Sequence, residues 1–326
     1  MRKNDRVFLT PIIVAFCCVM MVGGLAFAQE KFPSKPITIV VPWAAGGGND
    51  LMTRALQPII EKLAGVSVLV VNRVGAGATI GFGEVMRSAP DGYTLCNISG
   101  TLVIVKYTIK DTAVDYEKFE PIIFATYAPQ ALVVRKEAPW KNLKEFLDYA
   151  KANPGKLRVG DPGYGNPHHI SLLGIEKAAK VKFIPVHYKG TGAAMPDLLG
   201  GHIDAFISSL QDHLNLIKGG VIRAIGVASP ERNKFVPDVS TFVELGIDHN
   251  ILSFQGFVGP KGIPEARVKI LNDLFVKAFN TKEMETFCEA NGGTISLKGP
   301  VEFRKYLTEE DKRWKELITI GGIKPE

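Results

Sequence analysis

The sequence has few of the residues that build disulfide scaffolds, metal centres and nucleic-acid surfaces. It contains 4 cysteines and 6 histidines among 326 residues, and two of the cysteines stand in the apolar segment near the start. No expected helix carries two histidines at ligand spacing with an acidic partner, so a zinc hydrolase is not indicated. The basic residues are scattered and do not interleave with aromatic residues, which argues against nucleic acid as a partner.

Catalytic motifs are missing as well. A serine nucleophile of the G-x-S-x-G type is not indicated, because Asn97 occupies the first glycine position ahead of Ser99. The stretch from Gly75 to Gly81 resembles a loose dinucleotide fingerprint, but Ile80 stands where that fingerprint requires glycine. These absences favour a binding protein over an enzyme, and no motif indicates a cofactor.

Residues 1–28 have the pattern of a secretory signal. Three basic residues precede an apolar run over 7–27, and small residues stand at the positions that signal peptidase requires, so we expect a cut after Ala28. A retained membrane anchor is less favoured, because no cluster of positive charge follows the run. The mature chain then keeps Cys96 and Cys288, which either pair or stay buried.

The most informative stretch runs from Ile37 to Asp50, ITIVVPWAAGGGND. A continuous apolar run predicts a buried parallel strand, and apolar positions at helical spacing after residue 50 predict a helix. Three glycines between them allow close approach of the backbone to a bound group, and Asn49 or Asp50 is placed to cap the helix. A strand, a glycine turn and a helix N-terminus together form an anion site, although a single instance is equally consistent with an ordinary turn.

This pattern recurs along the chain. A strand over 66–72 leads through the glycine-rich turn 73–83 to an expected helix over 84–88, and a strand over 93–98 ends at Ser99. A later strand over 157–160 enters a third polar turn at 161–169. Because loops at the carboxyl ends of parallel strands meet along one edge of a sheet, they are expected to line a single crevice.

Two extended segments, 120–135 and 251–259, are expected to cross between two lobes. We therefore predict an α/β protein whose two lobes are each a mainly parallel sheet flanked by helices, joined by a two-segment hinge. Lobe 1 is assigned to 29–130 plus 253–326, and lobe 2 to 131–252. The first lobe is completed by amphipathic helices over 264–279, 282–290 and 300–320.

Several motifs now stand together in one order and spacing. They are Lys35-Pro36-Ile37, Val41-Pro42, Gly46-Gly47 through Asp50, Asn72-Arg73, Gly75-Ala76-Gly77, Ile80-Gly81, Pro90-Asp91-Gly92-Tyr93-Thr94-Leu95, Ala150 to Lys156, Gly163, Gly165, His169, Tyr188-Lys189-Gly190 and Leu198-Leu199-Gly200-Gly201. Across nearly the whole mature chain the sequence resembles the extracytoplasmic substrate-binding proteins of tripartite tricarboxylate transporters, the Bug receptor family.

The resemblance implies a two-lobed periplasmic-binding-protein fold, type II-like, in a monomeric periplasmic receptor. Such a receptor closes on a small carboxylate, a di- or tricarboxylate or an aromatic acid, and delivers it to a permease of one large and one small membrane subunit. In this family the carboxylate is held mainly by backbone N–H groups of loops corresponding to 43–50, 72–81 and 161–169, which agrees with the anion sites expected from the sequence pattern.

We accordingly expect ligand contacts from the three loops and from a few residues beyond them. The expected ligand-binding residues are Trp43, Ala45, Gly46, Gly47, Asn49, Asp50, Asn72, Gly77, Ala78, Thr79, Ser99, Gly163, Tyr164, Gly165, Asn166, His169, Tyr188, Lys189, Thr191 and Asp204.

The chain departs from the family pattern at three positions. Asn166 stands where serine is common, His187 stands where proline usually precedes the tyrosine, and His168 makes a doublet with His169. Two alternatives stay open at this point: a metal-binding receptor that uses the histidines of the second half, and an exported nicotinamide-dependent enzyme.

Overall fold

The computed structural model describes residues 31–325, so the expected signal peptide and its cut lie outside the described residues. One compact unit begins at Lys35, and the description below concerns this unit. Among the described residues, no helix combines the length and the hydropathy needed to cross a membrane.

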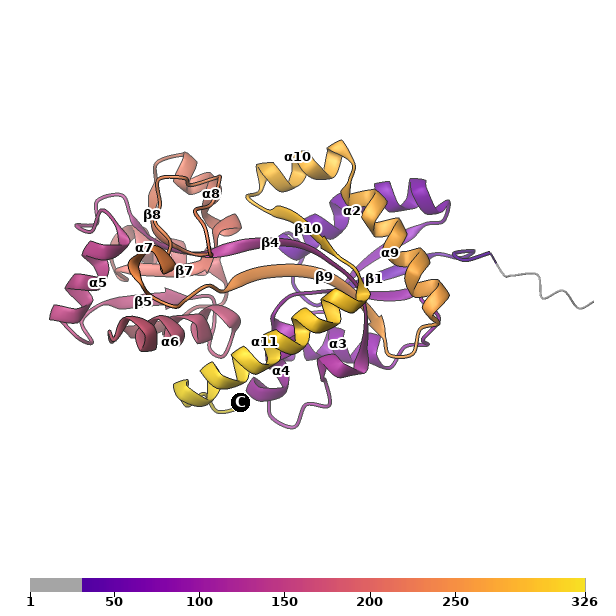
Figure 1. Cartoon of the computed structure of the whole chain (residues 1–326), viewed down its shortest axis with the longest axis horizontal. Coiled ribbons are helices and arrows are strands. Elements are labelled where there is room, and N and C mark those ends of the chain that lie inside the picture. The colour runs from indigo at the N-terminus through magenta and orange to yellow at the C-terminus, as the bar shows by residue number, and fades with distance from the viewer. Residues whose placement is uncertain (1–30, 326) are drawn as a thin grey trace, which may run out of the picture. The chain divides into compact units, whose positions relative to one another are not determined.

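The first half of the fold is built on a mixed sheet (Figure 1). Three parallel strands stand at one edge in the order β2-β1-β3, and the remaining strands, β9, β4 and β10, pair antiparallel beyond them. Their bounds are β1 Ile37–Val41, β2 Val68–Asn72, β3 Thr94–Ile98, β4 Phe119–Arg135, β9 Leu252–Pro260 and β10 Thr294–Lys298.

The second half has the same plan. Strands β6, β5 and β7 are parallel, and β4 and β8 pair antiparallel beside them. Their bounds are β5 Arg158–Asp161, β6 Ile184–His187, β7 Ala205–Ser209 and β8 Ile222–Ala228. The 17-residue strand β4 belongs to both halves, because it pairs with β9 up to Pro129 and with β7 and β8 from Gln130 onward.

The expected two-lobed α/β fold is therefore confirmed, with one refinement. Each sheet is mixed and not mainly parallel, because the crossing strands are themselves sheet members and run against the parallel strands. The expected crossings at 120–135 and 251–259 correspond to β4 and β9.

Helices cover both faces of each sheet. In lobe 2, alternate residues of β4 face opposite cores: Leu132 and Val134 pack with α5 and α6, whereas Ala131 and Val133 pack with α7 and α8. In lobe 1, α2 buries Met52, a residue at helical spacing from the other buried positions of the helix. The helices are α2 Gly48–Ala64, α3 Thr79–Met86, α4 Thr101–Thr108, α5 Leu143–Ala152, α6 Pro167–Ala179, α7 Thr191–Gly200, α8 Leu210–Lys218, α9 Glu265–Phe279, α10 Lys282–Ala290 and α11 Pro300–Gly321.

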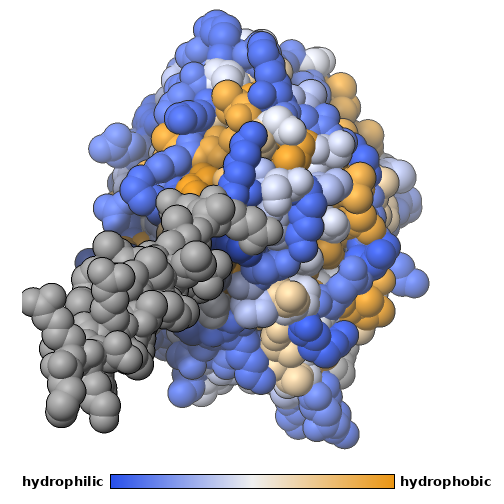
Figure 2. Space-filling model, turned by 90° about the vertical axis from the view of Figure 1, so that its right-hand side faces the viewer, coloured by the Kyte–Doolittle hydropathy of each residue, from blue (hydrophilic) through white to orange (hydrophobic). Residues whose placement is uncertain are grey.

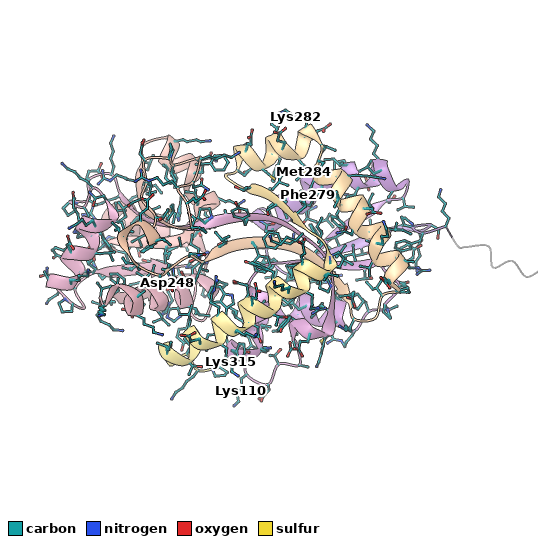
Figure 3. All side chains as sticks on the ribbon, in the orientation of Figure 1. Lys110, Asp248, Phe279, Lys282, Met284 and Lys315 are labelled. Carbon is teal, nitrogen blue, oxygen red and sulfur yellow. The ribbon has the colours of Figure 1, made fainter. Side chains whose placement is uncertain are left out.

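The end of the molecule that carries lobe 1 has a largely hydrophilic surface with smaller apolar areas between polar side chains (Figure 2). At α10 the pattern is plain: Lys282 begins the helix and points outward, whereas Met284 and, from α9, Phe279 are buried beneath it (Figure 3). Cys96 and Cys288 are both buried and unpaired, so the open question about their pairing is settled in favour of free thiols.

Two expectations about the helices were wrong. The helix expected over 84–88 begins at Thr79, so part of the second glycine-rich turn is helical. Helix α4 was not expected, because its Val103, Ile104 and Val105 are β-branched, yet all three are fully buried and their packing outweighs weak helix propensity.

Helix α11 packs against both lobes. It lies along α4 of lobe 1 and reaches α6 of lobe 2 (Figure 1). Lys177 Nζ lies 3.2 Å from Glu316 Oε1, and Arg313 Nη1 donates to Asn250 O at 3.2 Å. The C-terminal helices therefore complete lobe 1 as expected, but the last of them also contacts the second lobe.

Gly256 on β9 is the position where an added methyl group should cost most in the sheet. A Cβ there would lie 2.6 Å from Phe303 Cζ and 2.8 Å from the backbone oxygen of Ile123, and the backbone cannot yield easily. We expect Gly256→Ala to lower the free energy of unfolding by about 2 kcal/mol, measured by urea denaturation. Gly299→Ala is the matched control, because a Cβ there meets nothing within 4 Å; equal losses in both variants would contradict the packing argument.

Candidate functional site

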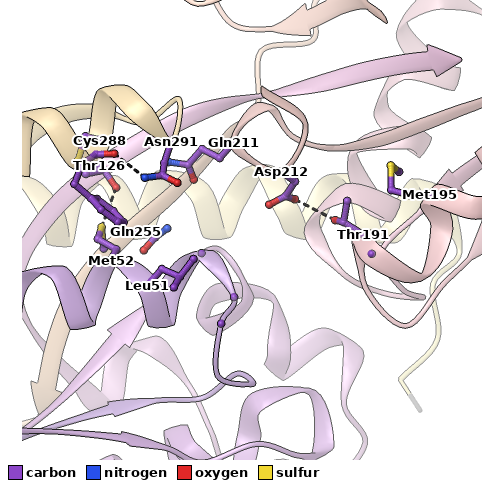
Figure 4. A pocket seen from close by; sticks show the side chains of 15 residues that line it. Leu51, Met52, Thr126, Thr191, Met195, Gln211, Asp212, Gln255, Cys288 and Asn291 are labelled. Atoms are coloured by element: carbon purple, nitrogen blue, oxygen red, sulfur yellow. Dashed lines mark hydrogen bonds between the residues drawn. The ribbon is translucent and has the colours of Figure 1, made fainter. Parts of the chain in front are cut away.

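A cavity of about 1100 Å³ lies between the two lobes, at the carboxyl ends of the parallel strands. A smaller one of about 320 Å³ adjoins it and shares Gly48, Thr126, Gln211, Asp212 and Gln255 with it (Figure 4). We call the two together the cleft. Its walls come from the loops after β1, β2 and β3, from the crossing strands β4 and β9, and from the loops of lobe 2.

Six helices of the described chain begin at the cleft. Their N-terminal or N-capping residues line it: Gly48 of α2, Ala78 of α3, Gly100 of α4, Asn166 of α6, Gly190 of α7 and Ser209 of α8. Helix N-termini carry partial positive charge and N–H groups without intrahelical acceptors. The cleft is therefore favourable for an anion without needing a fixed cation.

Several backbone N–H groups at the cleft are free. Those of Gly48, Asn49, Ala76, Gly77 and Gly100 have no acceptor among residues 31–325. Residues 76–78 have φ of 45, 59 and 76°, a turn conformation in which successive N–H groups can converge on an anion. These five amides form the anion site of lobe 1.

The loop after β1 is held in place by Asp50. Its carboxylate is 2 % exposed and accepts from Gly46 N (2.8 Å), Arg54 Nε (3.0 Å) and Asn72 Nδ2 (2.9 Å). Burial alone would raise the pKa of Asp50, but the hydrogen bonds from Arg54, Gly46 and Asn72 and the charge of Arg54 hold it below its usual value. The expected side-chain cap of α2 was wrong, because Gly47 is the N-cap and Asp50 bonds back to the loop.

Asn72 and Asn49 also have local partners. Asn72 Nδ2 donates to Trp43 O at 3.0 Å in addition to Asp50, which ties the first two loops together. Asn49 Nδ2 donates to Asn97 Oδ1 at 2.5 Å, so its side chain is anchored while its backbone N–H stays available to the cleft.

In lobe 2 the histidine doublet divides its roles. Asn166 caps α6, since its Oδ1 accepts from the amides of both His168 and His169 at 2.8 and 2.9 Å. His169 is buried and its Nδ1 accepts from Gly165 N at 3.0 Å, whereas His168 lines the cleft with Nε2 3.4 Å from Ser253 Oγ. Burial lowers the pKa of each imidazole to about 4, and the neighbouring His187 contributes for His169. Both are therefore neutral at pH 7.

Other expected contacts bond elsewhere. Tyr188 donates to Asp197 Oδ2 at 2.7 Å, and Asp204 accepts from the amide of Arg158 at 2.7 Å. The ring of Tyr164 stands 5.1 Å from that of His169, centroid to centroid, and its side chain does not line the cleft.

Half of the expected residues thus lie at the cleft and half do not. Those that line it are Trp43, Gly46, Gly47, Asn49, Gly77, Ala78, Ser99, Asn166, Lys189 and Thr191. Those that stand behind it or apart from it are Ala45, Asp50, Asn72, Thr79, Gly163, Tyr164, Gly165, His169, Tyr188 and Asp204.

Sequence reasoning missed the residues that line the cleft from the crossing strands and from two helices. Gln255 and Thr126 lie on β9 and β4, Gln211 and Asp212 begin α8, and Trp314 comes from α11. One signal was available: Gln255 is a polar residue inside an otherwise apolar crossing segment. Trp314 offered none, because it reads as an ordinary core position of an amphipathic helix.

The remaining histidines lie in separate hydrogen-bonded pairs. His187 Nδ1 lies 2.8 Å from Asp161 Oδ2, His213 Nε2 2.8 Å from Ser208 Oγ, and His249 Nε2 2.8 Å from Ser171 Oγ. Within residues 31–325, no group of three or more potential metal ligands converges.

The architecture and the cleft are those of a solute-binding protein with two lobes. The chain belongs to the family described as the tripartite tricarboxylate transporter family receptor, whose model matches residues 52–323. A UPF0065 protein in the gbd 5′ region of Cupriavidus necator is 34% identical over 324 residues, covering 99% of both chains.

Two solved structures are similar over the same range. The periplasmic binding protein BugD is 28% identical with a TM-score of 0.79, covering 90% of this chain and 100% of its own. MatC from Rhodopseudomonas palustris, with bound malate, is 29% identical with a TM-score of 0.76, covering 88% and 100%. The expected Bug-type receptor family is confirmed.

Proposed function

We propose that the protein is a monomeric periplasmic receptor that binds the carboxylate of a small solute in the cleft and delivers it to the membrane subunits of a tripartite transporter. One observation carries the proposal: five free amides and six helix N-termini meet at a cavity that, within residues 31–325, has Lys189 as its one lysine or arginine. The malate bound to MatC supports a carboxylate as ligand.

The proposed limits of the lobes, 29–130 plus 253–326 and 131–252, are supported by the pairing of β4. This strand changes partners between Pro129 and Gln130, and β9 begins its pairing at Leu252. The chain therefore crosses between lobes at the two places where a hinge can bend, and a ligand that contacts both lobes favours the closed state.

A calorimetric panel of carboxylates tests the proposal. Malate, citrate, C4 to C6 dicarboxylates, aromatic acids and amino acids are titrated into the mature protein, with a divalent cation and NAD as separate arms. We expect at least one carboxylate to bind. Tight binding of the cation or NAD with no carboxylate bound would contradict the proposal.

The anion site is tested most directly at Gly48. This residue is the first of α2, where proline is conformationally tolerated, and the preceding Gly47 has φ −76° and ψ 162°, which suits a residue before proline. Gly48→Pro deletes one free N–H, and we expect carboxylate affinity to fall about tenfold by calorimetry, since a hydrogen bond to a charged group contributes roughly 1.5–3 kcal/mol.

Gly48→Ala is the matched control, because it adds a Cβ but keeps the N–H, and the space beside it is open to 3.9 Å from Gln255 Nε2. We expect the alanine variant to lose little affinity. If both variants bind the carboxylate as the wild type does, the α2 amide is not part of the site.

A further inference from the structure

The cleft has an unusual distribution of charge for a carboxylate site. Within residues 31–325, its lining holds two side chains that are charged at neutral pH, Lys189 and Asp212, and no ion pair joins them. The anion site of lobe 1 is built from neutral amides. A ligand that fills the cleft therefore meets neutral donors on one side and a carboxylate on the other.

Asp212 is fixed in position by donors on one of its oxygens. Its Oδ2 accepts from Ser208 Oγ at 2.9 Å and from Thr191 Oγ1 at 3.1 Å (Figure 4). Because the single proton of Ser208 goes to Asp212, His213 Nε2 donates to Ser208 Oγ, at 2.8 Å. This chain of hydrogen bonds holds the carboxylate against the wall of the cleft.

The other oxygen of Asp212 is free. No partner of Oδ1 is found among residues 31–325, and the side chain is exposed to the cavity that it lines. The surrounding protein raises the pKa of Asp212, because removal of water disfavours the charged form. A cation placed beside Oδ1 would restore that lost stabilisation.

Two further polar groups at the cleft lack partners. Gln255 Oε1 and Ser209 Oγ have no hydrogen bond in the described chain, and each residue is only 8 % exposed. Both residues line the same cavity as Asp212. A buried oxygen acceptor without a donor is costly, so a ligand that brings donors to it is favoured.

We propose that Asp212 Oδ1, Gln255 Oε1 and Ser209 Oγ form a subsite for a primary ammonium group. This inference rests on the proposed function, because the carboxylate of the same solute occupies the amides of lobe 1. The preferred solutes then carry a carboxylate at one end and an ammonium group at the other. An ammonium brings three N–H donors and one positive charge, which match three oxygen acceptors of which one is ionised.

The same arrangement selects against a second carboxylate. A distal carboxylate would be placed near Asp212 with no donor to satisfy Gln255 Oε1, and like charges in a partly dehydrated cleft repel strongly. Lys189 is the group that could offset this repulsion, and its side chain is exposed. Discrimination therefore depends on the balance between Asp212 and Lys189.

Matched pairs of solutes test the proposal. We would titrate 4-aminobutanoate against succinate, 5-aminopentanoate against glutarate and 6-aminohexanoate against adipate, because each pair shares its chain length and one carboxylate. For the pair that fits best, the amino acid should bind at least about tenfold more tightly than the dicarboxylate. A dicarboxylate that binds as tightly as its partner, or binding of carboxylates without any amino acid of the series, would overturn the inference.

Variants separate the two charges. Asp212→Asn should weaken the best amino acid about tenfold and leave its dicarboxylate partner unchanged or tighter, whereas Lys189→Met should weaken the dicarboxylate only. An unchanged preference in Asp212→Asn overturns the subsite. If no carboxylate of any kind binds the wild type, the proposed function itself fails. Should Asp212→Asn not fold, the wild-type pairs and Lys189→Met still decide.

Discussion

Replacement of Asp50 by alanine should both destabilise the protein, by about 3 kcal/mol, and weaken carboxylate binding at least about tenfold. The buried carboxylate is the shared acceptor of Gly46 N, Arg54 and Asn72. Without it the loop that presents the amides of Gly48 and Asn49 loses its anchor. Urea denaturation and calorimetry with the best carboxylate measure the two effects.

Asp148→Ala provides the matched control on a surface helix. Asp148 pairs with Lys144 at 2.6 Å one turn away on α5, and both side chains are largely exposed. Exposed pairs of this kind contribute little, so its loss should change stability by less than about 0.5 kcal/mol and leave affinity unchanged. If Asp50→Ala folds as stably and binds as tightly as this control, Asp50 does not organise the site.

Acidification should destabilise the protein steeply below about pH 6.5, the usual pKa of a histidine in an unfolded chain. Burial lowers the pKa of His213 and of His249 to about 3, with smaller contributions from His168 and Arg313 respectively. Both imidazoles are neutral in folded and unfolded chains above pH 6.5. Between pH 6.5 and 3 the unfolded chain binds the proton first, so stability falls by about 1.4 kcal/mol per pH unit for each proton.

Other groups change the size of this effect. Burial raises the pKa of Asp161 to about 6, against hydrogen bonds from Gly163 and His187, so this carboxyl is protonated first in the folded protein and opposes the loss between pH 6 and 4. The raised pKa values of Asp212 and Glu310 act in the same direction. The lowered pKa of Asp50 adds to the loss at lower pH.

The pH dependence is measured by urea denaturation between pH 7.5 and 5. We expect His249→Gln to be less stable than the wild type at pH 7.5, because Ser171 loses its partner, but to lose less stability on acidification. His202→Gln is the control, since His202 is exposed and its imidazole is hydrated in both states. Equal pH profiles for the wild type and His249→Gln would contradict the assignment.

The sequence pattern predicts most of the fold because period and composition are local. The apolar runs at 37–41 and 94–98 and the long crossing at 119–135 are strands as expected, since they alternate with glycine turns that stop them. What local pattern missed depends on packing: α4 is rich in β-branched residues that favour strands, yet burial against α11 makes it a helix. Strand β10 is partly buried throughout and gave no clear alternation.

The candidate site was predictable in its backbone and not in its side chains. Gly46, Gly47 and Gly77 line the cleft because glycine at the end of a parallel strand marks that edge of the sheet. Which neighbour of a doublet faces the ligand depends on helix phase, so His168 and not His169 lines the cleft. Gln255 and Asp212 come from segments distant in sequence, and only the folded chain brings them to one cavity.

The positions of the three tryptophans give the protein its own optical reporter. Trp43 and Trp314 line the cleft, from the first loop of lobe 1 and from α11, whereas Trp140 lies in the core of lobe 2 beside Phe146. A solute that enters the cleft changes the surroundings of two indoles out of three. Intrinsic fluorescence, with Trp140→Phe to remove the background signal, can thus follow binding without a label attached to either partner.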